Sequence, residues 1–228
     1  MTRVAIIQSN YIPWIGYFEI ISTVSHFVFL DNVQYTSRDW RNRNQIKTPQ
    51  GKMWLTINVK DHNKQSLIED IRFESSNWKS QHLEAIRRNY RRAAHFEMTY
   101  QEIEEMYFEF HGDSLSKLNQ HLVRSIASKL GIVTQFHNSS DFITRINSSQ
   151  RLLDICQMLN AKTYVSGPSA RSYLDLDLFG RSDVSVEWFN YSERTYNQLW
   201  GGFEKGVSVI DPILNNGWDV LKSREEAP

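Results

Sequence analysis

The chain has 228 residues, of which 40% are hydrophobic and 13% aromatic, enough to bury a full core in one large domain. Its 26 lysines and arginines balance 26 aspartates and glutamates, so no overall charge favours nucleic acid or an anionic membrane. The single Cys156 excludes an internal disulfide, and no apolar run approaches the ~20 residues of a spanning helix. We therefore expect a soluble, cytoplasmic protein that does not insert into a membrane.

The first 44 residues predict a strand, a loop, a helix and a second strand. Two apolar runs of strand length, Val4–Gln8 and Phe27–Leu30, enclose a helix that opens just after Pro13. Each strand runs into polar residues, and the second ends on Asp31. Because ligands of open α/β sheets sit outside the carboxyl ends of the strands, this segment is interpreted as half of an active site.

The middle of the chain predicts a β-hairpin followed by three helices. The turn sequence Thr48-Pro49-Gln50-Gly51 lies between two strand-like runs, and a further short strand is expected at Leu67–Phe73. Apolar residues then recur at helical spacing. The helices are expected near Trp78–Ala93, after an N-cap in Ser75-Ser76-Asn77, around Ile103–Phe110, and from Ser114 to Gly131.

From residue 132 onward, strands and helices alternate, which favours a parallel sheet. The expected strands are Thr134–Asn138, Thr163–Ser166 and Ser185–Phe189, the expected helices are Ser149–Leu159 and Ser172–Phe179, and a closing helix ends on Gly217. The prediction is one α/β domain over residues 1–228, with a Rossmann-like, mostly parallel sheet, a β-hairpin and an α-helical insertion at residues 75–131.

The loop after the first strand carries the first set of candidate residues, Gln8, Asn10, Tyr11 and Gly16. The free N–H groups and the dipole of the following helix favour an anion, and Gly16 leaves space for a ligand or a neighbouring strand. The alternative is that the proline and glycine only shape the turn and the contact between helix and sheet.

The second set begins at Asp31, whose carboxylate can accept a proton, hold a sugar hydroxyl or bind a metal. Arginine binds phosphate or carboxylate through two parallel hydrogen bonds, and aromatic rings stack on bases or sugars. The candidate ligand-binding side chains in this loop are Gln34, Arg38, Trp40, Asn42 and Arg43. The alternative is a solvated loop with one salt-bridged aspartate.

A third loop again connects a strand to a helix. Its small residues and exposed N–H groups can surround an anion, although it lacks the GxxxxGK[ST] spacing and the lysine of a P-loop. Its candidate residues are Ser166, Gly167, Ser169, Arg171 and Tyr173. A plain turn is the alternative. In a parallel sheet, this loop and the first one would lie on the same rim.

The remaining features have less specific interpretations. Four arginines around Tyr90 fit either RNA binding or the solvated face of a helix, and Asn119 is either a hydrogen-bonding core residue or a pocket residue. The seven histidines are scattered without an HExxH or other ligand pair, so no metal site is expected. No motif identifies a cofactor, and GxSxG and GxGxxG are both absent.

Together these residues resemble the WbqC-like family over nearly the full length of the chain. The segments that carry the resemblance are Gln8–Phe18, Asp31–Tyr35, Arg38–Asn44, Trp54, Asn89-Tyr90, Leu118-Asn119, Arg151–Ala161, Tyr164–Leu174 and Ser208–Leu214. The chain departs from the family pattern at Ser9-Asn10 in place of Pro-Tyr, at Asn32 in place of a second aspartate, at Asn160 in place of glycine, and at Pro212. The missing aspartate argues against a shared proton or a metal at that position.

The resemblance implies a transferase of lipopolysaccharide, O-antigen or other surface-glycan synthesis. Its expected substrate is a nucleotide-linked or phosphorylated amino sugar, which would receive a glycyl, aminoacyl (from tRNA) or other acyl group. Asp31 is then the candidate general base or sugar-orienting carboxylate. The first helix with Arg38 and Arg43 would hold the diphosphate, and Tyr11 or Trp40 would stack on the base or sugar.

Two alternatives stay open at this point. One is an ATP-dependent activating enzyme with a looser likeness to nucleotidyltransferases, in which Ile15-Gly16-Tyr17 stands where that class has its HxGH histidines. The other is a non-catalytic RNA-binding or assembly protein. The transferase hypothesis predicts that Gln8, Tyr11, Asp31, Arg43 and Ser166–Ser169 line one concave pocket. The sequence does not indicate the oligomeric state.

Overall fold

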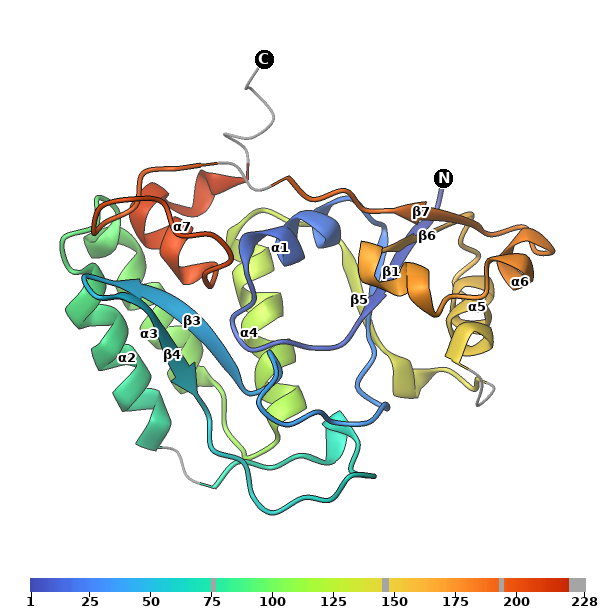
Figure 1. Cartoon of the computed structure of the whole chain (residues 1–228), viewed down its shortest axis with the longest axis horizontal. Helices are drawn as coiled ribbons and strands as arrows, with labels where there is room; N and C mark the ends of the chain where they lie inside the picture. The colour runs from blue at the N-terminus through green and yellow to red at the C-terminus, as the bar shows by residue number, and fades with distance from the viewer. Residues whose placement is uncertain (75–76, 145–147, 193–194, 222–228) are drawn as a thin grey trace.

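The computed structural model describes residues 1–74, 77–144, 148–192 and 195–221. Its centre is a sheet in the order β5-β2-β1-β6-β7, in which every pairing is parallel (Figure 1). The strands are β1 (Arg3–Ile7), β2 (His26–Phe29), β5 (Gln135–Asn138), β6 (Thr163–Ser166) and β7 (Ser185–Trp188). A separate antiparallel hairpin consists of β3 (Arg43–Thr48) and β4 (Gly51–Thr56). The predicted α/β class with a mostly parallel sheet is confirmed.

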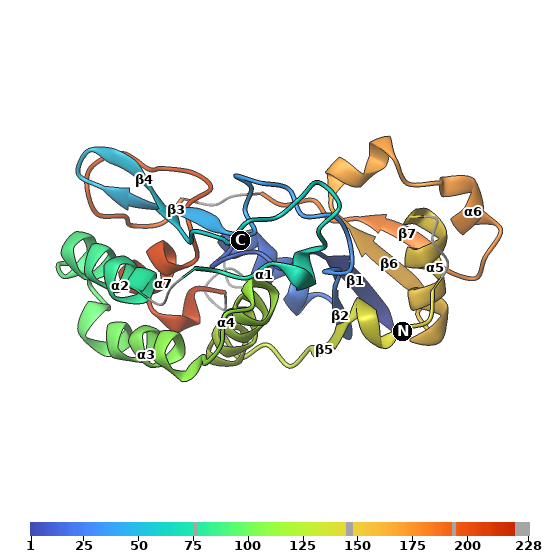
Figure 2. The same cartoon turned by 90° about the horizontal axis from the view of Figure 1, so that it is seen from below.

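The two faces of the sheet belong to two different cores, because successive side chains of a strand point in opposite directions. Val4 and Ile6 pack into a cluster with α5 (Ser148–Met158) and α6 (Leu176–Gly180). Ala5 lies in the larger cluster on the opposite face. Figures 1 and 2 show α5 and α6 on one side of the sheet and the other helices on the opposite side.

The larger core brings together the hairpin and most of the helices. The helices that supply it are α1 (Ile15–Ser22), α2 (Asn77–Tyr90), α3 (Phe96–Glu109), α4 (Leu115–Lys129) and α7 (Ile210–Asn216). Each turns an apolar stripe inward, as on α4, where Leu118, Leu122 and Ile126 are almost completely buried. The expected helix boundaries at Ser114, the N-cap of α4, and at Gly217, which has a φ of 83°, are both observed.

Two expected elements are wrong. The expected strand Leu67–Phe73 is a 3₁₀ helix, η1 (Ile68–Asp70), flanked by isolated bridges. Ile68 in η1 and Ile71 just after it are buried and three apart, whereas a half-buried strand buries every second residue, a spacing that only Ile71 and Phe73 keep. No ladder extends from the bridges, and the N–H of Glu69 instead donates to the carbonyl of Asp31 at 3.0 Å.

The expected helix Ser172–Phe179 is also wrong, because it is split into two short pieces. A 3₁₀ helix, η3 (Pro168–Ser172), ends before Asp175, whose side chain accepts a hydrogen bond from the N–H of Leu178 and caps α6. An aspartate at an N-cap starts a new helix rather than continuing the previous one. The expected N-cap at Ser75-Ser76 lies outside the described residues, and α2 is described from Asn77.

The sheet order places three loops at one edge of the molecule. Strand β1 lies between β2 and β6 and runs parallel to both. The residues that follow these strands, beginning at Gln8, Leu30 and Gly167, therefore emerge at the same carboxyl edge. This common edge is the position at which an open α/β sheet offers a ligand site.

Candidate functional site

Asp31 lies just beyond the carboxyl end of β2 and is only 3% exposed. One carboxylate oxygen, Oδ1, accepts a hydrogen bond from the N–H of Ser9 at 2.8 Å. The other, Oδ2, accepts from the hydroxyl of Ser116 and from the side-chain amide of Gln120, the latter at 3.1 Å. Three donors from the loop after β1 and from α4 therefore fix the orientation of this carboxylate.

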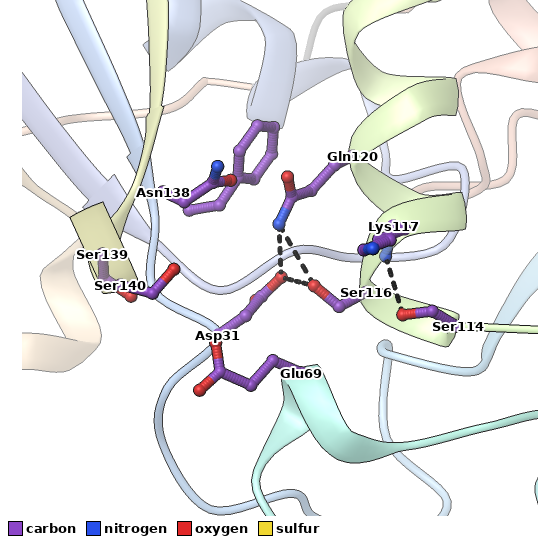
Figure 3. Close-up of a pocket in the computed structure, with 10 residues that line it drawn as sticks. Asp31, Glu69, Ser114, Ser116, Lys117, Gln120, Asn138, Ser139 and Ser140 are labelled. Carbon is purple, nitrogen blue, oxygen red and sulfur yellow. Dashed lines mark hydrogen bonds between the residues drawn. The ribbon is translucent and has the colours of Figure 1, made fainter.

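A polar cavity of about 140 Å³ opens beside Asp31. Figure 3 shows Ser116 and Gln120 extending toward the carboxylate from α4, with Glu69 on η1 and Ser139 after β5 on other sides. The lining residues are Phe29, Asp31, Glu69, Ser114, Ser116, Lys117, Gln120, Asn138, Ser139 and Ser140. Nearly all are polar, so the cavity suits a small group with several hydroxyl or amino substituents.

The carboxylate of Asp31 retains room for a ligand. An ionised carboxylate has about four acceptor positions, and the protein's own donors occupy three of those on Asp31. Glu69 lines the same cavity, and partial burial, followed by the nearby charges of Asp70 and Asp31, raises the pKa of its carboxyl group. The site thus combines an oriented carboxylate with a second acid that holds a proton more readily than an ordinary glutamate.

The departure from the family pattern at Asn32 has a structural counterpart. Its side-chain oxygen accepts a hydrogen bond from the hydroxyl of Ser139 at 2.7 Å, and its carbonyl accepts one from Arg151 at 3.2 Å. Asn32 therefore connects the loop after β2 to the loop after β5 and to α5. This contact holds one wall of the Asp31 cavity in place.

Gln8 and Asn10 come together around a residue that was not among the candidates, Arg41. The guanidinium group of Arg41 donates to the side-chain oxygen of Asn10 at 3.1 Å and to that of Gln8. It also lies 3.4 Å from the carboxylate of Asp39 and is only 11% exposed. Asn119, which is completely buried, donates to the carbonyl of Arg41 at 2.8 Å.

The loop after β1 contains a strained residue next to this cluster. Ile12 is fully buried and has a φ of 36°, a conformation that β-branched residues rarely adopt. Its carbonyl accepts hydrogen bonds from the side chains of Asn44 at 2.9 Å and Ser208 at 2.7 Å. These two side chains hold the strained backbone, and such strain is often kept where a loop is shaped for function.

Tyr11 has a different environment from the one expected for a ligand-binding residue. It is fully buried, and its hydroxyl lies 2.8 Å from Nδ1 of His82 and 2.7 Å from the hydroxyl of Tyr107. Nε2 of His82 lies 3.2 Å from the carbonyl of Thr56. A carbonyl can only accept a hydrogen bond, so Nε2 of His82 is the donor to Thr56. In a neutral imidazole the other nitrogen, Nδ1, then accepts a hydrogen bond from the hydroxyl of Tyr11. The hydroxyl of Tyr11 in turn accepts one from the hydroxyl of Tyr107. This position gives Tyr11 a structural role.

The other candidates of the second loop have mixed positions. Asn42 is buried and donates to the carbonyl of Ile57 at 2.9 Å, whereas Gln34 and Arg38 are exposed. Arg43 donates to the carbonyl of Arg38, and its guanidinium group lies 4.1 Å above the ring of Trp54. Trp40 is 39% exposed and its ring centre lies 5.4 Å from that of Trp54.

The third loop lies at the same edge of the sheet, after β6. Ser166 is buried and donates to the hydroxyl of Tyr164 at 3.3 Å, and Gly167 is the residue before η3. Ser169, Arg171 and Tyr173 are exposed, with the guanidinium group of Arg171 5.2 Å from the ring centre of Trp188. That these residues share one pocket with Asp31 stays a prediction.

Several residues of the Asp31 cavity were missed by sequence reasoning. Ser116 and Gln120 are four residues apart on α4 and therefore share one face of this amphipathic helix, but polar pairs at that spacing are common on such helices, so the sequence signal is weak. Glu69, Asn138 and Ser139 carry no comparable signal, because they approach Asp31 only through the packing of η1 and β5 against the sheet. Arg41 lies within the segment Arg38–Asn44, in which Arg38 and Arg43 were the arginines expected to bind a ligand and Arg41 was not.

No group of three or more His, Cys, Asp or Glu side chains that could hold a metal ion occurs among the described residues. Over the same residues, none of the helices has the length and apolar character needed to cross a membrane. Tyr90, the last residue of α2, is fully buried and its hydroxyl donates to Asp211 at 2.7 Å, so its ring points inward. Four arginines lie near it in the sequence, two within α2 and two just after its end. Two of them, Arg87 and Arg88, lie within 3.9 Å and 3.6 Å of Glu84.

Comparison with known proteins gives a family and one relative. The sequence profile of the WbqC-like protein family matches residues 8–223. The chain is 45% identical over 220 residues to the uncharacterized protein Rv1507c of Mycobacterium tuberculosis (strain ATCC 25618 / H37Rv), and the match covers 95% of each chain. No solved structure gives a significant match.

Proposed function

The chain belongs to the WbqC-like protein family, and we propose that it is a transferase that adds an acyl group to the amine of an amino sugar. The proposed acceptor is linked to a nucleotide or otherwise phosphorylated, and the proposed pathway is the synthesis of lipopolysaccharide, O-antigen or another surface glycan. The acyl group is glycyl, another aminoacyl group carried by tRNA, or a simpler acyl group.

The observation that carries this proposal is the oriented carboxylate of Asp31 beside a polar cavity of about 140 Å³. A cavity of roughly 150 Å³ holds a ring of the size of benzene, so the cavity beside Asp31 has room for the amine-bearing edge of a sugar rather than for a whole substituted sugar. The free acceptor position of Asp31 is suited to a charged or neutral amine. The side chains of Gln120, Asn138 and Ser139 on the same cavity offer donors and acceptors for ring hydroxyls.

In the proposed reaction, the sugar nitrogen attacks the carbonyl carbon of the acyl donor. The new N–C bond forms while the bond from that carbon to the donor's oxygen or sulfur breaks. One proton leaves the nitrogen for Asp31, and the leaving group takes up a proton, for which Glu69 with its raised pKa is the nearest candidate in the cavity. Asp31 thus acts as general base and also orients the amine.

The test is to incubate the purified protein with aminoacylated tRNA and nucleotide-linked amino sugars and to measure the mass of the sugar. Transfer of glycine would add the mass of one glycyl residue to the sugar and none to its N-acetylated counterpart, which has no free amine. Parallel reactions with acyl thioesters identify a simpler acyl donor. Failure of every donor to modify any free amino sugar would contradict the proposed function.

The alternatives make different predictions. An ATP-dependent activating enzyme would be stabilised by ATP plus a carboxylic acid without any requirement for an amino sugar. An RNA-binding protein would lose affinity steeply with rising salt, because phosphate contacts release counterions. The inward position of Tyr90 removes the aromatic ring that would stack on a base beside the four arginines at and after the end of α2.

A further inference from the structure

A second cavity, of about 280 Å³, lies on the aromatic side of the loop after β1. It is lined by Trp14, Trp40, Asn44, Tyr191 and Gly206. We propose that this cavity binds the base of the nucleotide that carries the substrate. The inference rests on the proposed function in one respect, since it assumes that the amino sugar is linked to a nucleotide.

The walls of this cavity favour a flat, largely apolar group. Of the described residues that line it, three are aromatic and one, Asn44, has an amide side chain. That amide is already engaged, because its nitrogen donates to the carbonyls of Tyr11 and Ile12 and its oxygen accepts from the N–H of Gln45. A sugar in this cavity would leave hydroxyl groups without partners, which is costly, whereas a base can stack on aromatic rings with its polar edge turned outward.

Gly16 allows the walls of the cavity to come together. A Cβ atom at this position would lie 2.5 Å from Nε1 of Trp14 and 2.7 Å from the ring of Tyr191. Both distances are too short for any side chain. Because Gly16 has none, the rings of Trp14 and Tyr191 can approach each other over the first turn of α1. Gly16 therefore contributes to the cavity rather than only to the helix–sheet contact.

The surroundings of the cavity suit the phosphates of a nucleotide. Trp14 is the residue before the first turn of α1, in which the N–H of Tyr17 donates to the carbonyl of Trp14 at 3.0 Å. The first N–H groups of a helix have no acceptor within the helix, so those of Ile15 and Gly16 are the ones that a phosphate can use. Trp40 is followed by Arg41, and its ring lies beside that of Trp54, on which the guanidinium group of Arg43 is stacked. The guanidinium groups of Arg41 and Arg43 therefore place positive charge near a base held against Trp40. This charge suits the negative phosphates of a nucleotide.

The test is the direct binding of GDP, ADP, UDP and CDP, with pyrophosphate as the ligand that lacks a base, measured by calorimetry. At least one nucleoside diphosphate should bind ten times more tightly than pyrophosphate. Replacing Trp40 by alanine should weaken that nucleotide about tenfold, as expected for one lost base–aromatic contact, and should leave pyrophosphate binding unchanged. Trp40→Phe, which keeps an aromatic ring, should restore most of the loss.

Phe108→Ala is the matched control. Phe108 is an aromatic residue of α3 that is 49% exposed, compared with 39% for Trp40, and it does not line the cavity. Its replacement should change nucleotide affinity less than twofold. An equal loss for Phe108→Ala and Trp40→Ala, or equal binding of pyrophosphate and all four nucleotides to the wild-type protein, would overturn the proposal.

The outcome separates this inference from the proposed function, because the binding measurement needs no turnover. Binding of a base that depends on Trp40, together with no acyl transfer to any amino sugar, would support the cavity and contradict the transferase. Acyl transfer to a sugar phosphate without a base, at the same rate as to the nucleotide-linked sugar, would contradict the cavity and support the transferase.

Discussion

Two buried polar clusters lie near the loop after β1, and they differ in whether the protein supplies all their partners. In the first, the hydroxyl of Tyr11 bonds to both His82 and Tyr107, and His82 bonds onward to the carbonyl of Thr56. In the second, Asp31 has three donors and opens onto a polar cavity. A closed network stabilises the fold, whereas an open one has capacity left for a ligand.

Buried polar atoms without a partner lie beside both clusters. Within the described parts of the chain, no hydrogen-bond partner exists for Oγ of Ser9, whose N–H binds Asp31, or for Oδ1 of Asn119. Nε1 of Trp78, whose ring packs on that of Tyr11, has none either. Because buried polar atoms in native proteins are nearly always paired, each of these atoms is a position at which a bound water or ligand can supply the partner. The contrast between the clusters therefore rests on the cavity beside Asp31.

The largest expected effect is on activity, for Asp31→Asn. The amide can keep its oxygen toward the N–H of Ser9, while the hydroxyl of Ser116 and the amide of Gln120 can reorient to accept from it. Transfer activity should fall by about 10²–10⁴-fold, the usual contribution of a general base. The melting temperature should stay close to that of the wild type.

Asp61→Asn is the control for this prediction, since Asp61 is an exposed aspartate that does not line the cavity. The activity of this variant should equal that of the wild type. A large loss of stability in Asp31→Asn with activity retained would make Asp31 a structural residue and remove the distinction between the two clusters.

The closed cluster should respond to pH through His82. Burial lowers the pKa of His82 from 6.5 to about 4, so between these values the unfolded chain binds a proton that the folded chain does not. The free energy of unfolding is therefore unaffected by this titration above pH 6.5. It falls as the pH is lowered from 6.5 toward 4, by about 3 kcal/mol in total. Denaturant unfolding at a series of pH values measures this loss.

The histidine itself can be tested by comparing the wild type with His82→Gln. The variant lacks the titrating group, so its stability should fall less steeply between pH 6.5 and 4.5 than that of the wild type. If the stability of the two proteins fell equally with pH, His82 would have the same pKa in the folded and unfolded chains. That result would contradict the claim that the closed network holds His82 neutral.

Tyr11→Phe should affect stability without affecting chemistry. The change leaves Nδ1 of His82 and the hydroxyl of Tyr107 without a partner in the core, at a cost of about 1–3 kcal/mol in the free energy of unfolding. Tyr107→Phe removes only the outer donor and should cost less. Both variants should keep wild-type values of kcat and KM, so a selective loss of kcat in Tyr11→Phe would place Tyr11 in the site.

The overall fold could be predicted because its signals are local. The strand-length apolar runs and their alternation with amphipathic helices indicated a parallel sheet, and the edge of that sheet follows from the strand order. The positions of Asp31 and Gln8 after their strands could be predicted for the same reason. The strand expected at Leu67–Phe73 failed because alternation over so short a run cannot be distinguished from a 3₁₀ turn with two buried isoleucines.

The interior of the site could not be predicted, because it depends on distant contacts. Tyr11 follows a strand end like a ligand-binding residue, yet its partners His82 and Tyr107 lie 71 and 96 residues away. The donors that orient Asp31 from α4 are 85 and 89 residues away. Which polar residue becomes buried in a closed network and which faces a cavity is set by this packing, and no local pattern records it.

The smallest expected effect is that of Gly16→Ala. The added methyl group would force Trp14 and Tyr191 apart, at a typical overpacking cost of about 1–3 kcal/mol, of which the better helix propensity of alanine restores about 1 kcal/mol, so stability should fall slightly. Affinity for the preferred nucleoside diphosphate should fall about fivefold, the lower end of the range for one base contact. Unchanged nucleotide affinity would show that the two rings are not part of a binding wall.

The most direct test of the central claim is the binding of a nucleotide-linked amino sugar to wild-type protein and to Asp31→Asn, measured by calorimetry without an acyl donor. The N-acetylated sugar serves as the matched ligand, because it lacks only the free amine. If Asp31 holds that amine, the amino sugar should bind the wild type at least about tenfold more tightly than the N-acetylated sugar, the discrimination expected for a charge-assisted hydrogen bond. This preference should disappear in Asp31→Asn. Equal preference in the two proteins would contradict the assignment of Asp31 to the substrate amine.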